Sequence, residues 1–261
     1  MAMKILNNIK TLITADDFGF SENINRAIFE AYENKRITEM SLMVDCFGSE
    51  EAFKYVRENK VENVGLHFSL VRISKNGKIL RGDDYDRMLR DWTPEQLQKA
   101  FDEEVSIFEN SVGFKPKHII GHKHISLNLK LVKYVADYCI KNNCYARRGE
   151  RSTKMQHFTL KADPIPEGLK IGRIVDSVLG FKYGSPEEMC REYKDEIEAL
   201  KANNNQTSIE IFFHPGYSGD FEKLHTSFVQ ERIDDINFLM SDWFLKLIEE
   251  ENLELLPSSE I

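Results

Sequence analysis

The stretch TLITADDFGFSENINRAIFEA, residues 11–31, decides the fold of this chain. It begins as an apolar run with β-branched residues and ends in two adjacent carboxylates, Asp16 and Asp17, followed by Gly19. Ser21 then stands where an N-cap is expected, because apolar or small residues recur at helical spacing after it. The stretch therefore predicts a buried strand that carries charge at its carboxyl end and leads into an amphipathic helix.

The same alternation continues along the chain. It predicts an α/β fold with a mostly parallel sheet and crossover helices, because runs of consecutive strands are absent. About seven strand–helix steps fit a deformed, closed or nearly closed (β/α) barrel of the TIM type. A doubly wound open sheet is the competing architecture. The strands are expected at 11–17, 37–44, 61–70, 116–122, 144–149, 172–181, 207–217 and 253–261. The helices are expected at 22–36, 49–60, 93–113, 127–143, 185–204 and 233–252, and a long loop at 72–92.

Length and composition narrow the class of protein. The 261 residues are 41% hydrophobic and show no linker or repeat, so one domain over residues 1–261 is expected. The net charge of -8 comes without a basic stripe, which argues against a nucleic-acid partner and an anionic membrane. Four scattered cysteines, with no signal peptide or membrane span, indicate a cytoplasmic protein. A homodimer is left open.

Polar side chains follow four separate predicted strands. Asp16 and Asp17 end the first, and His67 lies near the end of the third. The pair His122 and His124, expected on one face of an extended segment, follows the fourth, and His214 ends a late strand. Active sites of parallel α/β folds form at the carboxyl ends of the strands, so these side chains predict one site.

The residue types indicate a metal-assisted reaction. Imidazole suits zinc, nickel, iron or copper, and a carboxylate also suits magnesium or manganese. Two histidines and one carboxylate leave positions open for water and substrate. One of the two aspartates would then hold the metal and the other would handle a proton, since a cation offsets the repulsion between them. Each residue alone also has a structural explanation, such as a charged turn or a core histidine. His118, His157 and His225 are expected to be structural.

Five segments together resemble a known family. TADDFGFSENINRAIFEA, SLMV, VGLHFSL, PKHIIGHKH and EIFFHPGY appear in the order seen in the YdjC/ChbG-like carbohydrate deacetylase family, over residues 11 to about 217. The resemblance implies a deformed (β/α) barrel. It also implies removal of the acetyl group from a small N-acetylated carbohydrate, typically a chitin-type oligosaccharide.

The resemblance also implies roles for particular residues. Asp16 would accept a proton, and Asp17, His67 and His122 would bind one divalent metal ion, magnesium or zinc. His214, in the HPG motif, would act as the general acid or as an orienting group. Three further residues are candidates for additional metal or substrate contacts, namely His124, Arg147 and Tyr217. Apart from the resemblance, sugar sites commonly use aromatic faces, so Tyr85, Trp92, Phe181 and Tyr183 are weaker candidates for substrate contacts, as is Arg148.

One departure from the family pattern lies in the fourth-strand segment. The family usually reads THxDSHHHVH there, whereas this chain reads KHIIGHKHIS, so Ile120 replaces an aspartate. Loss of an outer hydrogen-bonding carboxylate would weaken metal binding about 10–100-fold. Two alternatives therefore stay open, namely another metallohydrolase of the amidohydrolase or phosphoesterase type, and a sugar-binding homologue that has lost activity.

Overall fold

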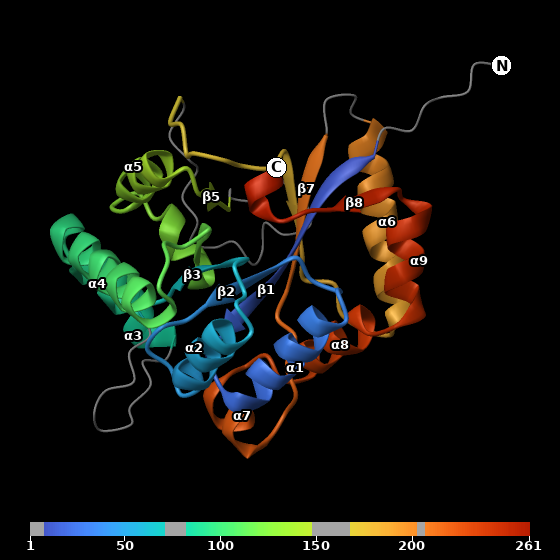
Figure 1. Ribbon diagram of the computed structural model, residues 1–261, viewed down its shortest axis with the longest axis horizontal. Coiled ribbons are helices and arrows are strands. Elements are labelled where there is room, and N and C mark those ends of the chain that lie inside the picture. Colours follow the sequence, from blue (N-terminus) through green and yellow to red (C-terminus); the bar gives the residue numbers. More distant parts are fainter. Residues whose placement is uncertain (1–7, 71–81, 148–167, 203–206) are drawn as a thin grey trace.

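The computed structural model describes residues 8–70, 82–147, 168–202 and 207–261, and its strands form one curled sheet (Figure 1). The strands are β1 (Ile9–Phe18), β2 (Glu39–Leu42), β3 (Val64–Phe68), β4 (His118–Gly121), β5 (Tyr145–Ala146), β6 (Ser177–Leu179), β7 (Ser208–Phe213) and β8 (Leu253–Leu255). Their order across the sheet is β5, β4, β3, β2, β1, β7, β6, and β8 pairs with β1. Every strand ladder in the described residues is parallel.

Helices connect the strands and cover the sheet from outside. They are α1 (Glu22–Glu33), α2 (Ser49–Glu58), α3 (Gly82–Asp91), α4 (Pro94–Val112), α5 (Val132–Asn142), α6 (Pro186–Ala202), α7 (Asp220–His225), α8 (Gln230–Leu239) and α9 (Asp242–Glu250). Two 3-10 turns, η1 (His122–Leu127) and η3 (Ser258–Glu260), complete the order. The predicted N-cap at Ser21 is present, because its hydroxyl accepts from the Ile24 N–H, and Thr93 forms a capping box with Gln96 at the start of α4.

The strand order distinguishes the two predicted architectures. Read in a circle it follows the chain, since β1 to β5 are neighbours in sequence and β6 and β7 lead back to β1. A doubly wound sheet would instead reverse at an internal strand. The circle is open between β5 and β6, where a single parallel bridge joins Tyr145 to Arg173 in the described residues. The prediction of a deformed (β/α) barrel is confirmed, and the doubly wound alternative is wrong.

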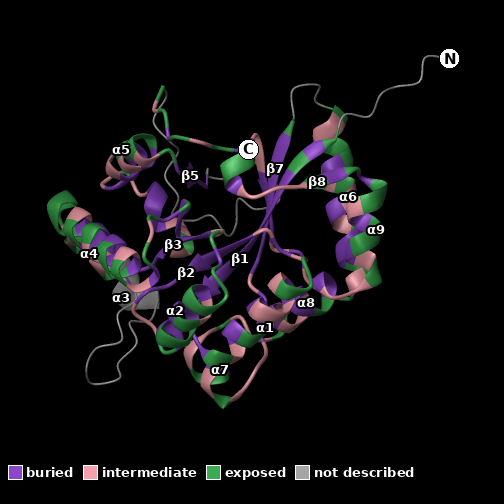
Figure 2. Ribbon diagram, in the orientation of Figure 1, coloured by how far each residue is buried: buried purple, intermediate pink, exposed green. Residues whose placement is uncertain are grey.

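The strands are buried on both faces (Figure 2). Along β1, Ile13 packs in the main core between the sheet and the helices, whereas Leu12 belongs to a small cluster with Tyr145 and Phe212. This alternation follows from the two-residue period of a strand, so the small cluster marks the inside of the barrel. Thr14 shares that inner face of β1 with Leu12. Polar side chains near the carboxyl ends of the strands thus point into the barrel.

Two sequence-based predictions of elements are wrong in part. Of the loop expected at 72–92, residues 82–91 form α3, whose only apolar side chains late in the helix are Met88 and Leu89. So short an apolar pattern gives no helical period to detect. The helix expected at 233–252 is two helices, because the Ser241 hydroxyl accepts from the Phe244 N–H and starts α9.

A third prediction fails at the HxH segment. Residues 122–127 form the 3-10 turn η1 and not an extended segment. Lys123 and His124 have φ angles of 51° and 58°, which lie in the left-handed region. His122 and His124 therefore do not share the face of a strand.

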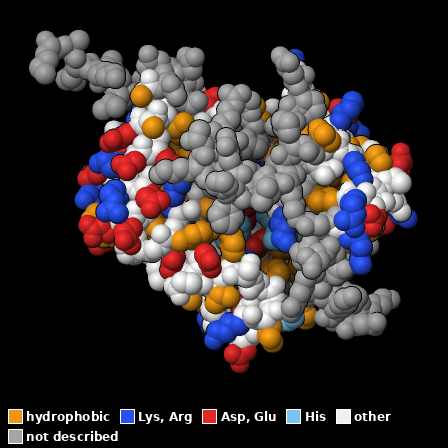
Figure 3. All heavy atoms as spheres, turned by 180° about the vertical axis from the view of Figure 1, so that it is seen from behind, with side chains coloured by type: hydrophobic (Ala, Val, Ile, Leu, Met, Phe, Trp, Pro, Cys, Tyr) orange, Lys and Arg blue, Asp and Glu red, His pale blue; other side chains and the backbone are white. Residues whose placement is uncertain are grey.

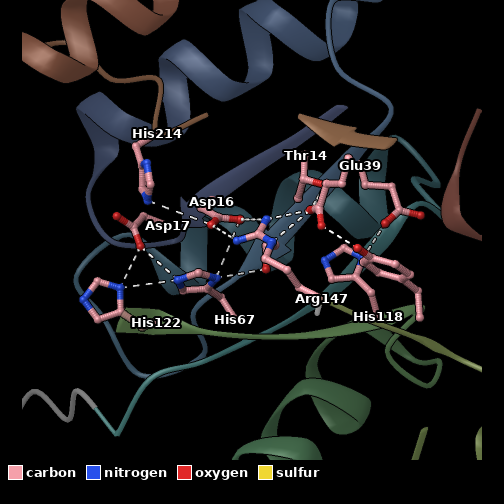
Figure 4. Close-up of polar contacts among 12 residues, drawn as sticks. Thr14, Asp16, Asp17, Glu39, His67, His118, His122, Arg147 and His214 are labelled. Carbon is pink, nitrogen blue, oxygen red and sulfur yellow. Dashed lines mark hydrogen bonds and ion pairs between the residues drawn. The ribbon is translucent and has the colours of Figure 1, made fainter. Parts of the chain in front are cut away.

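A buried contact between an imidazole and a carboxylate lies away from the strand ends that carry the predicted site. His118 Nδ1 and Glu39 Oε2 are 2.5 Å apart, both side chains are fully buried, and Glu39 also accepts from the Ser258 N–H over 2.7 Å (Figure 4). Burial by itself would raise the pKa of Glu39, but His118 and Ser258 lower it. His118 is thus structural, as predicted.

The His118→Phe variant is expected to unfold with a free energy about 3–5 kcal/mol below that of the wild type, because the Glu39 carboxylate loses its buried partner. Urea denaturation at pH 7 measures this difference. Since the pKa of Glu39 is lowered in the folded state, its contribution is present above its unfolded pKa of about 4.3 and is lost as the pH falls through the folded value. The double variant Glu39→Gln/His118→Phe should recover much of the loss, and a single-variant change below about 1 kcal/mol would contradict the pairing.

No helix in the described ranges is long and apolar enough to cross a membrane. The one sheet and its main core run from β1 to β8. One domain over residues 1–261 stays a prediction.

Candidate active site

A bulge in β1 brings both adjacent aspartates to one side of the strand. Ala15 pairs with Met40 and Phe18 with Leu42, so three steps along β1 oppose two along β2. Asp17 takes up the extra residue with a φ of 63°, in the left-handed region that aspartate tolerates better than most residues. In a regular strand, Asp16 and Asp17 would point to opposite faces. The bulge explains how both carboxylates can act in one site.

Asp17, His67 and His122 converge at the carboxyl ends of β1, β3 and β4 (Figure 4). Asp17 Oδ1 lies 3.1 Å from His67 Nε2 and 3.0 Å from His122 Nδ1. The two imidazole nitrogens are 3.3 Å apart. These three side chains form a group that could hold a metal ion, with all ligand atoms within 4.8 Å of one another.

The spacing of these atoms fits a divalent cation. Two ligand atoms at right angles, each about 2.1 Å from an ion, lie about 3.0 Å apart. The three separations of 3.0–3.3 Å are close to this value. Two imidazoles and one carboxylate suit zinc, while the carboxylate oxygen also suits magnesium.

His67 is oriented by Ser41 on β2. Ser41 Oγ and His67 Nδ1 are hydrogen bonded at 3.0 Å, which leaves Nε2 to face Asp17. Ile120 pairs with His67 across β3 and β4 and is fully buried. The orientation of His67 therefore does not depend on an aspartate at position 120.

Arg147 holds Asp16 from the opposite side of the barrel. Its Nη1 and Nη2 donate to the two carboxylate oxygens of Asp16 over 2.5 and 3.0 Å. Its Nε and Nη2 also donate to Glu210 Oε1 over 3.0 and 2.7 Å. Glu210 in turn accepts from the hydroxyls of Thr14 and Tyr145. Both carboxylates share one guanidinium, which fixes the orientation of Asp16.

Both aspartates stay ionised. Burial by itself would raise the pKa of Asp16, but Arg147 and His67 lower it to about 2. Burial would likewise raise the pKa of Asp17, but Arg232 and His122 lower it well below its usual range. Two buried carboxylates next to each other therefore remain charged because each has a guanidinium partner.

His214 lies at the end of β7 within an aromatic wall. Its ring stacks on Phe181, with centroids 5.5 Å apart, and meets Phe228 and Phe212 edge-on. Its Nε2 is 3.9 Å from Asp16 Oδ2. Burial lowers the pKa of His214 to about 4, so the imidazole is neutral at pH 7. Neutral His214 faces the ionised oxygen of Asp16.

Helix α8 contributes two side chains that sequence reasoning missed. Arg232 Nη2 donates to Asp17 Oδ2 over 2.6 Å. Asp235 accepts from the backbone N–H of His214 over 2.7 Å. Burial raises the pKa of Asp235 well above its usual range, although the N–H of His214 opposes this shift. One helix thus contacts the site at both β1 and β7.

These groups line a cavity of about 550 Å³. Seen from behind, acidic and histidine side chains lie near the centre of the face, beside hydrophobic ones (Figure 3). The cavity brings together most of the predicted site residues, namely Asp16, Asp17, His67, His122, His124, Arg147 and His214. Its aromatic lining consists of Phe20, Phe181, Phe212 and Phe228.

Other predicted residues lie in different surroundings. His124 lines the cavity outside the three-residue group, and burial lowers its pKa to about 4. Tyr217 is not among the lining residues, because its hydroxyl donates to Glu30 on α1 and Arg26 lies over its ring at 4.7 Å. His225, expected to be structural, also lines the cavity. Arg148 and His157 lie outside the described residues.

Some of the missed residues had a signal in the sequence. Glu210 interrupts the apolar strand SIEIFF, and a charge in a strand buried on both faces needs a partner. Ser41 lies in a short buried strand, but serine there is common. Arg232 and Asp235 lie in a helix rich in charge, where nothing in the spacing separates them from solvated residues.

The chain is similar to known proteins over almost its full length. A carbohydrate deacetylase from Clostridium beijerinckii is 26% identical over 261 residues, covering 97% of this chain and 100% of that protein. A chitooligosaccharide deacetylase from Salmonella dublin is 26% identical over 243 residues, covering 88% of this chain and 90% of that protein. A crystal structure from Enterococcus faecalis V583, named for cellobiose-phosphate cleavage, has a TM-score of 0.77 at 20% identity, and covers 97% of this chain and 99% of that one.

The structural likeness supports the barrel fold alone, since the identity is low. The family profile described as YdjC-like protein matches residues 10–250, in agreement with the resemblance inferred from the five segments. Because this match spans most of its length, the chain belongs to the YdjC-like protein family.

Proposed function

We propose that this protein is a metal-dependent hydrolase that removes the acetyl group from N-acetylated sugars. The observation that carries the proposal is the pairing of two different aspartates in one cavity. Asp17 lies in a group with the spacing of metal ligands, and Asp16 has its carboxylate beside that group but bound to Arg147. The relatives named as carbohydrate and chitooligosaccharide deacetylases support the reaction and the sugar class.

Asp17, His67 and His122 would hold one divalent cation, magnesium or zinc. When bound, such a cation polarises the amide carbonyl and lowers the pKa of water from about 15.7 to about 7. Asp17 would supply the charge of the ligand set, and the two imidazoles would supply nitrogen donors. Ser41 keeps the ring of His67 in the orientation that this role needs.

Asp16 would accept the proton of the attacking water. Arg147 keeps its carboxylate charged and fixed, so that the base needs no reorientation. The pKa of about 2 makes Asp16 a weak base, so Asp16 would not retain the proton. His214, with a pKa of about 4 and its Nε2 at 3.9 Å, is the stronger base of the two. A proton taken by Asp16 would therefore pass to His214 through one bridging water, because 3.9 Å is longer than a direct hydrogen bond.

His214 would then donate this proton to the departing amine. The ring cannot hold a proton in the resting site at pH 7, because burial lowers its pKa to about 4. It would become an acid only after Asp16 has collected the proton from water. Asp235 holds the backbone N–H of His214, and the stacked ring of Phe181 keeps the imidazole in place for both transfers.

Acetate release is expected to require a divalent cation. Dialysis of the protein against a chelator should abolish acetate release from N-acetylated mono- and oligosaccharides, and added Mg²⁺ or Zn²⁺ should restore it. An enzymatic acetate assay over a panel of sugar lengths measures both the activity and the preferred substrate. Full activity after chelation, with no metal left in the protein, would contradict the proposed role of Asp17, His67 and His122.

The same assay separates the alternatives. Phosphate release without acetate release would indicate another kind of metallohydrolase. Tight sugar binding at saturating metal, without acetate release, would indicate a sugar-binding homologue. We further propose that the protein acts in the cytoplasm, since its four cysteines are free, and on a small carbohydrate that the cavity of about 550 Å³ can hold. His124 is proposed as a substrate contact.

A further inference from the structure

Arg232 binds one carboxylate oxygen of Asp17 and leaves the other facing the two imidazoles. Its Nη2 donates to Oδ2 over 2.6 Å, while Oδ1 faces His67 Nε2 and His122 Nδ1 over 3.1 and 3.0 Å. The side chains of Asp17 and Arg232 are 2% and 4% exposed, so water does not weaken the pair. With Oδ2 occupied, only Oδ1 is directed at the two imidazoles.

The guanidinium is held in this position by the turn that follows β7. The backbone carbonyl of Arg232 accepts from the Gly216 N–H over 3.2 Å, and its Nη1 lies 3.5 Å from the His214 carbonyl. A Cβ on Gly216 would lie 3.1 Å from Arg232 Cδ, so the turn after β7 packs directly on the side-chain stem. Asp235, one turn further along α8, accepts from the His214 N–H. Arg232 is therefore fixed by contacts to the turn as well as by its charge.

Whether Arg232 strengthens or weakens the binding of a cation follows from its own positive charge. Hydrogen-bonded outer partners of metal ligands, including donors to a ligating carboxylate, generally support metal binding, and their loss weakens it about 10–100-fold. Arg232 is a donor and a cation, so it withdraws charge from Asp17 and repels a second positive charge nearby. Removing it should strengthen metal binding, which is the opposite of what the loss of a structural contact would do.

We infer that Arg232 is a positioning residue that restricts Asp17 to one ligand oxygen and keeps the cation affinity of the Asp17–His67–His122 group below its intrinsic value. This inference rests on the proposed metal site. The carboxylate would then donate less charge to the cation. This lowers the cation affinity but favours stronger polarisation of a bound carbonyl.

The test is cation affinity measured without turnover. Isothermal titration of Zn²⁺ and Mg²⁺ into metal-free protein should give a Kd at least about tenfold lower for Arg232→Met than for the wild type. Arg232→Lys, which retains the charge, should stay within about threefold of the wild type. Lys246→Met, on the exposed face of α9, is the matched control for loss of one positive charge. It should leave the Kd for both cations unchanged.

A second readout tests the restriction to one oxygen. The visible absorption of Co²⁺ depends on coordination number, so Co²⁺ spectra of wild type and Arg232→Gln should agree, since glutamine can still donate to Oδ2. The spectrum of Arg232→Met should differ, because Oδ2 of Asp17 would then be free to contact the cation. Acetate release should fall in Arg232→Met although the metal is bound more tightly.

The outcomes are separable. If the wild type binds Zn²⁺ but Arg232→Met binds it equally or more weakly while remaining folded by circular dichroism, the inference is overturned and the proposed function stands. If Arg232→Met is unfolded, the Kd of Arg232→Gln decides in its place, because this variant loses the charge but keeps the hydrogen bond. A Kd below that of the wild type supports the inference, and an equal or higher Kd overturns it. If the wild type binds no divalent cation, both the inference and the metal-dependent function are overturned.

Discussion

The Asp16→Asn variant is expected to lose about 10²–10⁴-fold in kcat, the usual contribution of a positioned general base. Asparagine keeps the shape of the side chain and one oxygen for Arg147, but it cannot take a proton from water. The metal content should stay unchanged, because Asp16 is outside the group formed by Asp17, His67 and His122. Steady-state acetate release and elemental analysis of the same preparation measure the two quantities.

The control for this variant is Asp137→Asn on α5. Asp137 is exposed and pairs with Lys133 one turn earlier, so its loss changes the charge of the protein by the same amount away from the cavity. This control should retain wild-type kcat. If Asp16→Asn retains a kcat within about threefold of the wild type, Asp16 is not the base, and His214 becomes the candidate for that role.

The His67→Ala variant should lose both stoichiometric metal and acetate release. His67 Nε2 is one of three ligand atoms, and two remaining donors do not form a stable protein site for zinc. The variant should stay folded, since the ring borders a cavity of about 550 Å³ and the core residues Leu66 and Phe68 beside it in β3 are unchanged. Metal content after dialysis and circular dichroism report these two results separately.

His124→Ala is the matched comparison. It removes the same ring from the same cavity, but His124 is outside the three-residue group and has a left-handed backbone in η1. This variant should retain one metal per chain. Its KM should change, as proposed for a substrate contact. Unchanged metal content in His67→Ala, or its loss in His124→Ala instead, would require a different ligand set.

Much of the barrel could be predicted from the sequence. Strands such as β7 are mostly apolar, and helices such as α4 carry both a capping box and a terminal glycine. The elements that were missed or misplaced are those in which local signals are weak. Helix α3 has few apolar residues, and the break between α8 and α9 depends on a single serine cap. The turn η1 depends on left-handed residues that no propensity indicates.

The site was predictable only where its residues end strands. Asp16, Asp17, His67 and His214 follow apolar runs, so the parallel topology brings them together without further information. Arg232 and Asp235 reach the site from a helix, and the contact of that helix with the turn after β7 depends on packing of distant segments. Sequence periodicity tells which face of a helix is apolar, but not which neighbour its polar residues meet.

The irregular end of β1 has a consequence for how this family can change. A uniform ladder through Ala15 and Phe18 would relieve a left-handed aspartate, whose conformation costs roughly 1 kcal/mol or more. It would also turn one carboxylate away from the cavity. Selection for thermal robustness and selection for chemistry therefore oppose each other at Asp17, and a stabilised descendant with a straightened strand would be a sound barrel without a working site.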